Sequence, residues 1–149
     1  PSLSVRENLR TAGYLYRGDD LERRVDRALA RFPALAERGR ARAGDLSGGQ
    51  QQMLALAMAL VHEPEVLVID ELSLGLAPIV VADLLTTVRG LKDQGQTMII
   101  VEQSLNMARA LADRALFMEK GAVRFDGPIA DLVDREDLAR AVFLGGTEA

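Results

Sequence analysis

Two short apolar runs on either side of an amphipathic helix limit the folds open to this chain. Val66 to Ile69 and Thr97 to Val101 are uninterrupted runs made mainly of β-branched and other apolar residues. Runs of this length are typical of parallel strands covered on both faces. Residues 79–92 between them place apolar side chains on one helical stripe, and Gln94-Gly95 suits a left-handed helix cap. The pattern predicts a right-handed strand–helix–strand crossover in an α/β fold.

The rest of the chain is predicted to be mostly helical. Met53 to Val61 is almost wholly apolar, so we expect a helix that is buried on most sides. Two runs joined by Lys120-Gly121 predict a β-hairpin. The other expected elements are helices at Ser4–Gly13 and Asp19–Arg31, a helix capped by Ser104, hairpin strands at Ala115–Glu119 and Ala122–Asp126, a small helix from Pro128 and a terminal helix at Glu136–Leu144.

Length and composition exclude several classes of protein. With 149 residues and 48% apolar content, the chain fits one domain with a packed core. The absence of cysteine excludes a disulfide framework and any thiolate metal site. A net charge of −4 argues against a general nucleic-acid binder, although residues 1–45 carry +3 and the remainder −7. No apolar stretch approaches the roughly 20 residues that span a bilayer, so we expect no direct membrane insertion.

The string Leu46-Ser47-Gly48-Gly49-Gln50 precedes the apolar helix directly. Serine is a preferred helix N-cap and glycine is tolerated beside it, so a plain capped helix start is one interpretation. A single turn residue would suffice for that purpose. Two successive glycines leave backbone N–H groups uncovered at the positive end of a helix, where a phosphate group binds well. The string therefore favours a phosphate contact.

Asp70 and Glu71 follow the first predicted strand directly. A surface acid pair or a helix cap is the alternative to a functional role. At the carboxyl end of a parallel strand, however, side chains emerge into the crevice where ligands bind. Two adjacent carboxylates there favour a cation, and a Mg²⁺ ion that bridges phosphates would meet Asp70 while Glu71 orients the attacking water.

Taken together, these motifs resemble the ATP-binding subunits of ATP-binding cassette (ABC) transporters. Leu46 to Gln50 resembles the family's signature loop, Val66 to Asp70 its Walker B strand, and Glu71 the glutamate that follows that strand. Residues 1–9, 73–78 and 101–104 resemble the subgroup that imports branched-chain amino acids. The resemblance extends over nearly the whole chain.

The resemblance implies an α/β fold with a P-loop NTPase-like (RecA-like) parallel sheet core, here incomplete, and an N-terminal helical subdomain. The limits it implies are 1–62 for the helical subdomain with the signature loop, 63–127 for the C-terminal part of the core and 128–149 for a helical tail. It also implies ATP and Mg²⁺ as cofactors and a head-to-tail dimer.

In such a dimer the signature residues Ser47, Gly48, Gly49 and Gln50 would bind the nucleotide held by the second subunit. Asp70 would hold the metal and Glu71 would catalyse hydrolysis in its own subunit. The partners implied are a second ABC ATPase subunit and membrane permease subunits, which would hold the protein on the cytoplasmic face of the cell membrane. The resemblance offers no reason to expect nucleic-acid binding.

The sequence departs from the family pattern at several places. No Gly-x-x-x-x-Gly-Lys-Ser/Thr loop occurs in the 149 residues, so we expect the chain alone to be inactive. By the resemblance this Walker A loop would lie before Pro1. Gln103 stands where the family has its switch histidine, and the resemblance places it in the catalytic set. Leu72 and Met58 replace a common proline and a common arginine.

Two competing functions stay open. One is a truncated or degenerate ABC domain that self-associates without ATPase activity, which the missing Walker A lysine favours. The other is an ABC ATPase of DNA repair or translation, against which the acidic balance argues. The missing Walker A strand would leave an interior gap in the family's sheet, so we predict that Thr97–Val101 pairs with Ala115–Glu119, or that another chain fills the gap.

Overall fold

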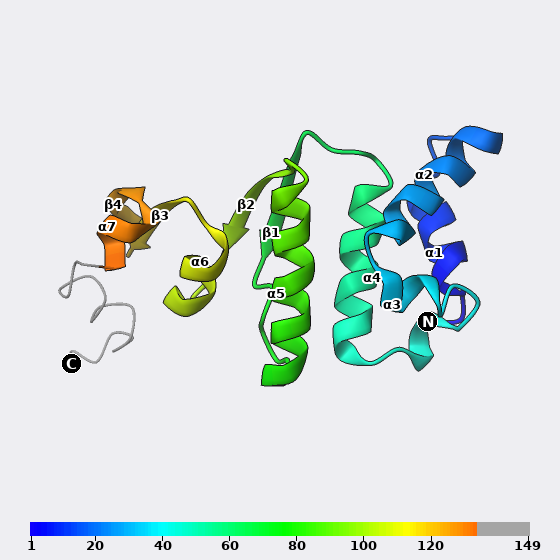
Figure 1. Cartoon of the computed structure of the whole chain (residues 1–149), viewed down its shortest axis with the longest axis horizontal. Coiled ribbons are helices and arrows are strands. Elements are labelled where there is room, and N and C mark those ends of the chain that lie inside the picture. Colours follow the sequence, from blue (N-terminus) through cyan, green and yellow to red (C-terminus); the bar gives the residue numbers. More distant parts are fainter. Residues whose placement is uncertain (134–149) are drawn as a thin grey trace. The chain divides into compact units, whose positions relative to one another are not determined.

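The computed structural model describes residues 1–133 and divides the chain into two compact units. The first comprises Pro1–Leu67 and Ser73–Ile99, and the second comprises Val68–Leu72 and the described residues from Ile100 to Val133. The elements are α1 (Val5–Ala12), α2 (Gly18–Ala30), α3 (Pro33–Ala36), a 3₁₀ turn (Ala43–Asp45), α4 (Gly48–Leu60), β1 (Val66–Asp70), α5 (Pro78–Asp93), β2 (Thr97–Val101), α6 (Leu105–Leu111), β3 (Arg114–Glu119), β4 (Ala122–Pro128) and α7 (Ile129–Val133) (Figure 1).

The first unit contains the helical core. Helix α1 begins at Ser4, whose side chain accepts from the Glu7 N–H while the Glu7 carboxylate accepts from the Ser4 N–H. This reciprocal capping box satisfies two donors that a helix start otherwise leaves unpaired. Helices α1, α2 and α3 all pack against α4. The fully buried side chains that fix this packing include Val5, Leu9, Val25, Phe32 and Leu35.

Helices α4 and α5 run side by side in the same unit (Figure 1). Helix α4 is buried on most sides, as its apolar sequence predicts. Helix α5 buries Leu84, Val88 and Leu91 on a single stripe. It ends at Asp93, with Gln94 as the C-cap and Gly95 at a φ of +84°. The amphipathic helix and its left-handed cap are therefore confirmed.

The described strands form two separate two-stranded sheets. Strands β1 and β2 are parallel neighbours joined through α5, and β3 and β4 form an antiparallel hairpin in which Phe117 faces Phe125. Lys120 and Gly121 close the hairpin with φ angles of +50° and +79°. The α/β class, the crossover unit and the hairpin are confirmed.

Two expectations about the strands are wrong. Strands β1 and β2 are not covered on both faces, because Val68 is 63% exposed and Ile99 is 55% exposed. Within residues 1–133, β2 does not pair with β3 either, since each lies in a different sheet. A run of apolar residues shows that a strand is suited to burial. Whether its faces are in fact buried depends on which segments, distant in sequence, pack against them. Filling of the gap by another chain stays a prediction, and the expected helix at Glu136–Leu144 lies outside the described residues.

Candidate nucleotide-binding and hydrolysis site

The signature residues form the start of α4, in the first unit. Ser47 is the N-cap, and its hydroxyl oxygen accepts from the Gln50 N–H at 3.4 Å. The Gln50 side-chain oxygen accepts from the Ser47 N–H at 3.1 Å in return. Gln51 secures the preceding turn by donating to the Leu46 carbonyl at 3.2 Å. The loop is therefore a capping box with a fixed shape, which the sequence indicated as one interpretation.

The two glycines of this loop occupy different environments. Gly48 is exposed, and a Cβ added to it would meet only the Leu76 Cδ2 atom at 3.5 Å, an ordinary contact. Gly49 is buried, and a Cβ added to it would lie 2.1 Å from the Val80 Cγ1 atom at the start of α5. The second glycine is thus required by packing, and that reason could not be inferred from the sequence. The exposed N–H of Gly48 stands in the first helical turn, where no intrahelical acceptor exists.

Asp70 and Glu71 lie in the second unit, where β1 ends. Asp70 is exposed, and among residues 1–133 its carboxylate has no hydrogen bond or ion pair. Glu71 has a φ of +49°, and its N–H donates to the Val101 carbonyl at 3.0 Å. The next residue, Leu72, is fully buried. A non-glycine residue in this backbone region is strained, and such strain is concentrated at functional sites.

Gln103 lies beside Glu71 in the same unit. It lies two residues after the end of β2, and its Nε2 atom donates to Glu71 Oε1 at 2.8 Å. The structure thus joins two residues that are 32 positions apart in the chain, both of which the resemblance assigns to catalysis. The side-chain contact itself has no local sequence signal, because it depends on how β1 and β2 pair.

The donor set at the end of β1 fits a magnesium ion. Mg²⁺ is held by one or two carboxylates together with phosphate oxygens and water, and it does not require a cage of protein ligands. Asp70 supplies one exposed carboxylate without a partner. No group of three or more acidic, histidine or cysteine residues suited to a metal occurs within the described part of the chain. These residues could therefore hold Mg²⁺ through the Asp70 carboxylate together with phosphate oxygens.

A cluster of charged and aromatic side chains, not singled out by the sequence, fixes the turn between α4 and β1. Arg24 of α2 donates to Glu63 at 3.1 Å and stacks 4.0 Å from the centroid of the Tyr16 ring. Arg27 donates to the same carboxylate at 2.8 Å, and this contact lowers the pKa of Glu63 below its ordinary value. The cluster ties the end of the signature helix to α2.

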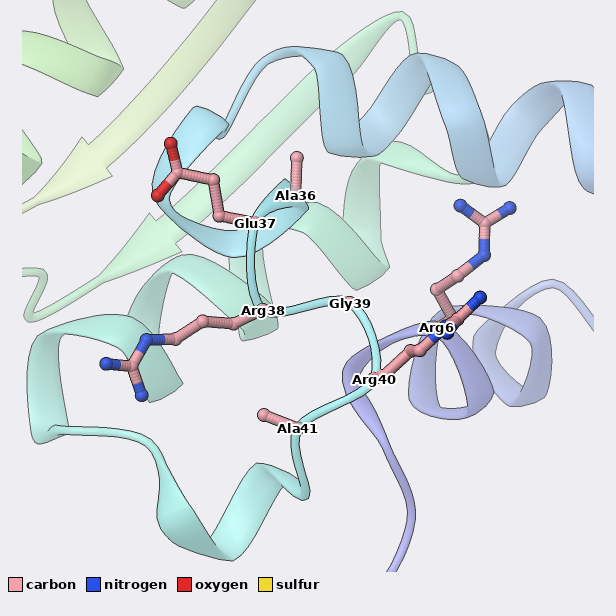
Figure 2. A pocket seen from close by; sticks show the side chains of 7 residues that line it. All are labelled: Arg6, Ala36, Glu37, Arg38, Gly39, Arg40 and Ala41. Atoms are coloured by element: carbon pink, nitrogen blue, oxygen red, sulfur yellow. The ribbon is translucent and has the colours of Figure 1, made fainter.

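A pocket of about 560 Å³ lies elsewhere in the first unit, between α1 and the loop after α3. Figure 2 shows Arg6 and Arg40 on one side of it and Glu37 and Arg38 on the other. Arg6 is already neutralised, since it donates to Asp26 at 2.7 Å and to Glu22 at 3.2 Å. None of the residues assigned to nucleotide chemistry lines this pocket.

Comparison with known proteins agrees with the motifs. The model of the ABC transporter family matches residues 1–73. The branched-chain amino acid transport ATP-binding protein BraG of Pseudomonas aeruginosa is 42% identical over 97% of this chain and 61% of its own length. The probable branched-chain amino acid transport ATP-binding protein LivF of Archaeoglobus fulgidus is 36% identical over 91% of this chain and 58% of its own length. The chain thus spans about three fifths of these relatives.

Solved structures agree on the fold. CbiO1 of Clostridium perfringens, described as part of an ABC transporter complex, matches with a TM-score of 0.81 at 28% identity, over 97% of this chain and 59% of its own. The ADP conformation of MJ1267, an ATP-binding cassette, matches with a TM-score of 0.82 over 97% of this chain and 64% of its own. At 23% identity the second match shows the fold alone. On the combined strength of family model, relatives and fold, the chain belongs to the ATP-binding proteins of ABC transporters.

Proposed function

We propose that this chain is part of an ATP-binding subunit of an importer for branched-chain amino acids and that its residues hydrolyse ATP there. The single observation that carries the proposal is the geometry of Glu71. Its backbone conformation, its N–H bond to Val101 and its contact with Gln103 hold a carboxylate at the end of β1. The names of the similar proteins BraG and LivF supply the substrate class.

The proposed chemistry is phosphoryl transfer to water. Glu71 accepts a hydrogen bond from the attacking water and orients it, as the water-positioning residue does in phosphoryl transfer. Asp70 would hold Mg²⁺, which neutralises developing charge on the phosphates when it is bound. Ser47, Gly48, Gly49 and Gln50 would contact the phosphates of a nucleotide held by a second subunit. The N–H groups at the start of α4 suit that role.

The proposed partners are a second ATPase subunit and membrane permease subunits. No helix among residues 1–133 is long and apolar enough to cross a membrane. The proposal also includes a peripheral position on the cytoplasmic face, reached through a permease. The isolated 149-residue chain is proposed to be inactive, because it has no Walker A loop.

The test compares this chain alone with a fusion in which the BraG segment outside the matched region is joined to it. We expect Mg²⁺-dependent ATP hydrolysis from the fusion and none from the chain alone. In the fusion, Glu71→Gln should abolish turnover and keep ATP binding, measured by calorimetry. Equal turnover in the fusion with and without the Glu71 carboxylate would refute the assigned role. Tight Mg²⁺-dependent ATP binding by the chain alone would refute the proposed inactivity.

The competing proposal, a domain that self-associates without ATPase activity, is favoured by one observation. Apolar side chains on the strands are exposed, among them Val68 at 63% and Leu116 at 56%. Exposed apolar strand surfaces promote association. Sedimentation of the chain at several concentrations tests this proposal. A monomer at all concentrations would contradict it.

A further inference from the structure

The loop after α3 carries two arginines that no carboxylate neutralises. Arg38 and Arg40 are exposed, and within residues 1–133 neither guanidinium group takes part in a hydrogen bond or ion pair. The arginines of the neighbouring helices α1 and α2 differ in this respect. Five of them form ion pairs with aspartate or glutamate: Arg6, Arg10, Arg23, Arg24 and Arg27. The positive charge of the loop is therefore available to a ligand.

The backbone of this loop is held on both sides of Arg40. The Gly39 carbonyl accepts from the Arg6 N–H at 3.0 Å, and the Ala41 carbonyl accepts from the Val5 N–H at 3.0 Å. Both bonds tie the loop to the start of α1. Among the described residues, the Arg40 N–H has no acceptor. The loop thus combines a fixed backbone with one unpaired backbone donor.

Both arginines line the pocket of about 560 Å³ beside α1 (Figure 2). This volume lies within the range of about 300–1,000 Å³ that is typical of small-molecule sites. Glu37 is the one acidic residue in the lining, and Figure 2 shows it on the side of Arg38, away from Arg40. Arg6 also lines the pocket, but Glu22 and Asp26 neutralise it. The lining is therefore positive even when Arg6 is counted as neutral.

The chemistry of these donors favours a phosphate group. An arginine side chain presents its N–H groups in a planar fork that matches phosphate oxygens, and two forks beside a backbone N–H suit a group with several oxygens and more than one negative charge. A single carboxylate has two oxygens and one charge. We infer that Arg38 and Arg40 bind a phosphate group that belongs to a soluble small molecule or to a lipid headgroup. The inference does not depend on ATP hydrolysis, since Ser47–Gln50, Asp70 and Glu71 do not line this pocket.

The first measurement titrates the 149-residue chain with inorganic pyrophosphate and follows NMR chemical shifts. We expect shifts at the Nε–H groups of Arg38 and Arg40 and at the Arg40 N–H, with half-saturation near 1 mM, which corresponds to about two charge-assisted hydrogen bonds. Arg40→Gln, and separately Arg38→Gln, should weaken this binding by about 10-fold or more. The absence of shifts in this loop, or a response confined to Gly48 of the signature loop, would overturn the inference.

The matched control is Arg42→Gln, which removes the same charge from the same loop. Arg42 is exposed and, in the part of the chain that the structure describes, its side chain has no partner, but it does not line the pocket. Only long-range attraction is lost, so pyrophosphate binding should weaken by no more than about 3-fold. An equal loss in Arg42→Gln and Arg40→Gln would show general charge attraction and overturn the site. Equal affinity for succinate, a dicarboxylate, would overturn the choice of phosphate.

The second measurement separates the two sources of the phosphate. A lipid headgroup predicts that the chain sediments with phosphatidylcholine vesicles that contain about 30% phosphatidylglycerol, and that Arg40→Gln stays in the supernatant. A soluble ligand predicts pyrophosphate binding without sedimentation on these vesicles. Binding to neither probe, or sedimentation that is equal for the parent chain and Arg40→Gln, would refute the inference and leave the proposed ATP hydrolysis unaffected.

Discussion

The start of α4 allows a sharp prediction about the second glycine of the signature loop. Substitution of Gly49 by alanine places a Cβ atom 2.1 Å from Val80 Cγ1, with Val80 Cβ at 3.4 Å and Cγ2 at 3.7 Å. Carbon atoms in contact normally lie about 3.5–4.0 Å apart. Cγ1 alone therefore makes the clash. We expect Gly49→Ala to destabilise the protein through this single methyl group.

The magnitude follows from two opposing effects. Overpacking of this kind costs about 1–3 kcal/mol, because a β-branched side chain in a helix has one strongly preferred rotamer and cannot turn away freely. Alanine in place of glycine near a helix start recovers up to about 1 kcal/mol of helix propensity. We therefore expect a net loss of about 1–2 kcal/mol in the free energy of unfolding. In a Val80→Ala background the clash is removed, so Gly49→Ala should be neutral or stabilising there.

Urea denaturation of the four proteins of this double-mutant cycle measures the prediction. For a slope of about 2 kcal/mol per molar urea, the expected loss shifts the midpoint by about 0.5–1 M. Gly48→Ala is the matched control, since the added Cβ meets only Leu76 Cδ2 at 3.5 Å. Without a clash, this substitution should leave the free energy of unfolding unchanged or raise it by up to about 1 kcal/mol. An equal cost of Gly49→Ala in both backgrounds would show that contact with Val80 is not the cause of the destabilisation.

Three further predictions concern other parts of the chain. Leu72→Ala should lower the free energy of unfolding by about 2–4 kcal/mol, because it removes a fully buried side chain beside the acid pair; calorimetric unfolding that shows no loss would contradict its anchoring role. Ion pairing lowers the pKa of Glu63, so this pair stabilises the protein at pH values above the ordinary pKa of 4.5, and the contribution disappears as the pH falls through the lowered pKa. Glu63→Gln should therefore reduce the stability lost between pH 7 and pH 3 by about 0.5 kcal/mol. Urea midpoints measured across that pH range test this expectation. Asp70→Asn in the BraG fusion should weaken the Mg²⁺ dependence of ATP hydrolysis with little effect on stability, since the side chain is exposed and unpaired; an unchanged Mg²⁺ titration would exclude Asp70 as a ligand.

Much of the fold could be predicted from local patterns. The periods of the apolar residues gave α5, β1 and β2, and the turn residues Lys120-Gly121 gave the hairpin. Capping rules marked the starts of α1 and α4 at Ser4 and Ser47. These features depend on residues within a few positions of one another, so they can be predicted from the local sequence.

The cover of the strands and the pairing of β2 could not be predicted in this way. Exposure of Val68 and Ile99 depends on which other segments pack on the strands, and that information is nonlocal. The same limit applies to the site. The sequence supplied Asp70, Glu71 and Gln103 as candidates, but only the pairing of β1 with β2 shows that Gln103 reaches Glu71.

The sequence by itself determined the family motifs, the element types and the residues able to contact phosphate, metal and water. The tertiary structure determined which of these residues are buried, which are exposed and which contact one another. A Cβ atom on Gly49 would clash with Val80 of α5, whereas a Cβ atom on Gly48 would make only an ordinary contact. Oε1 of Glu71 accepts a hydrogen bond from Gln103. The physical reason is that capping and periodicity act within one or two helical turns, whereas steric contact and side-chain hydrogen bonds join residues that only the folded chain brings together.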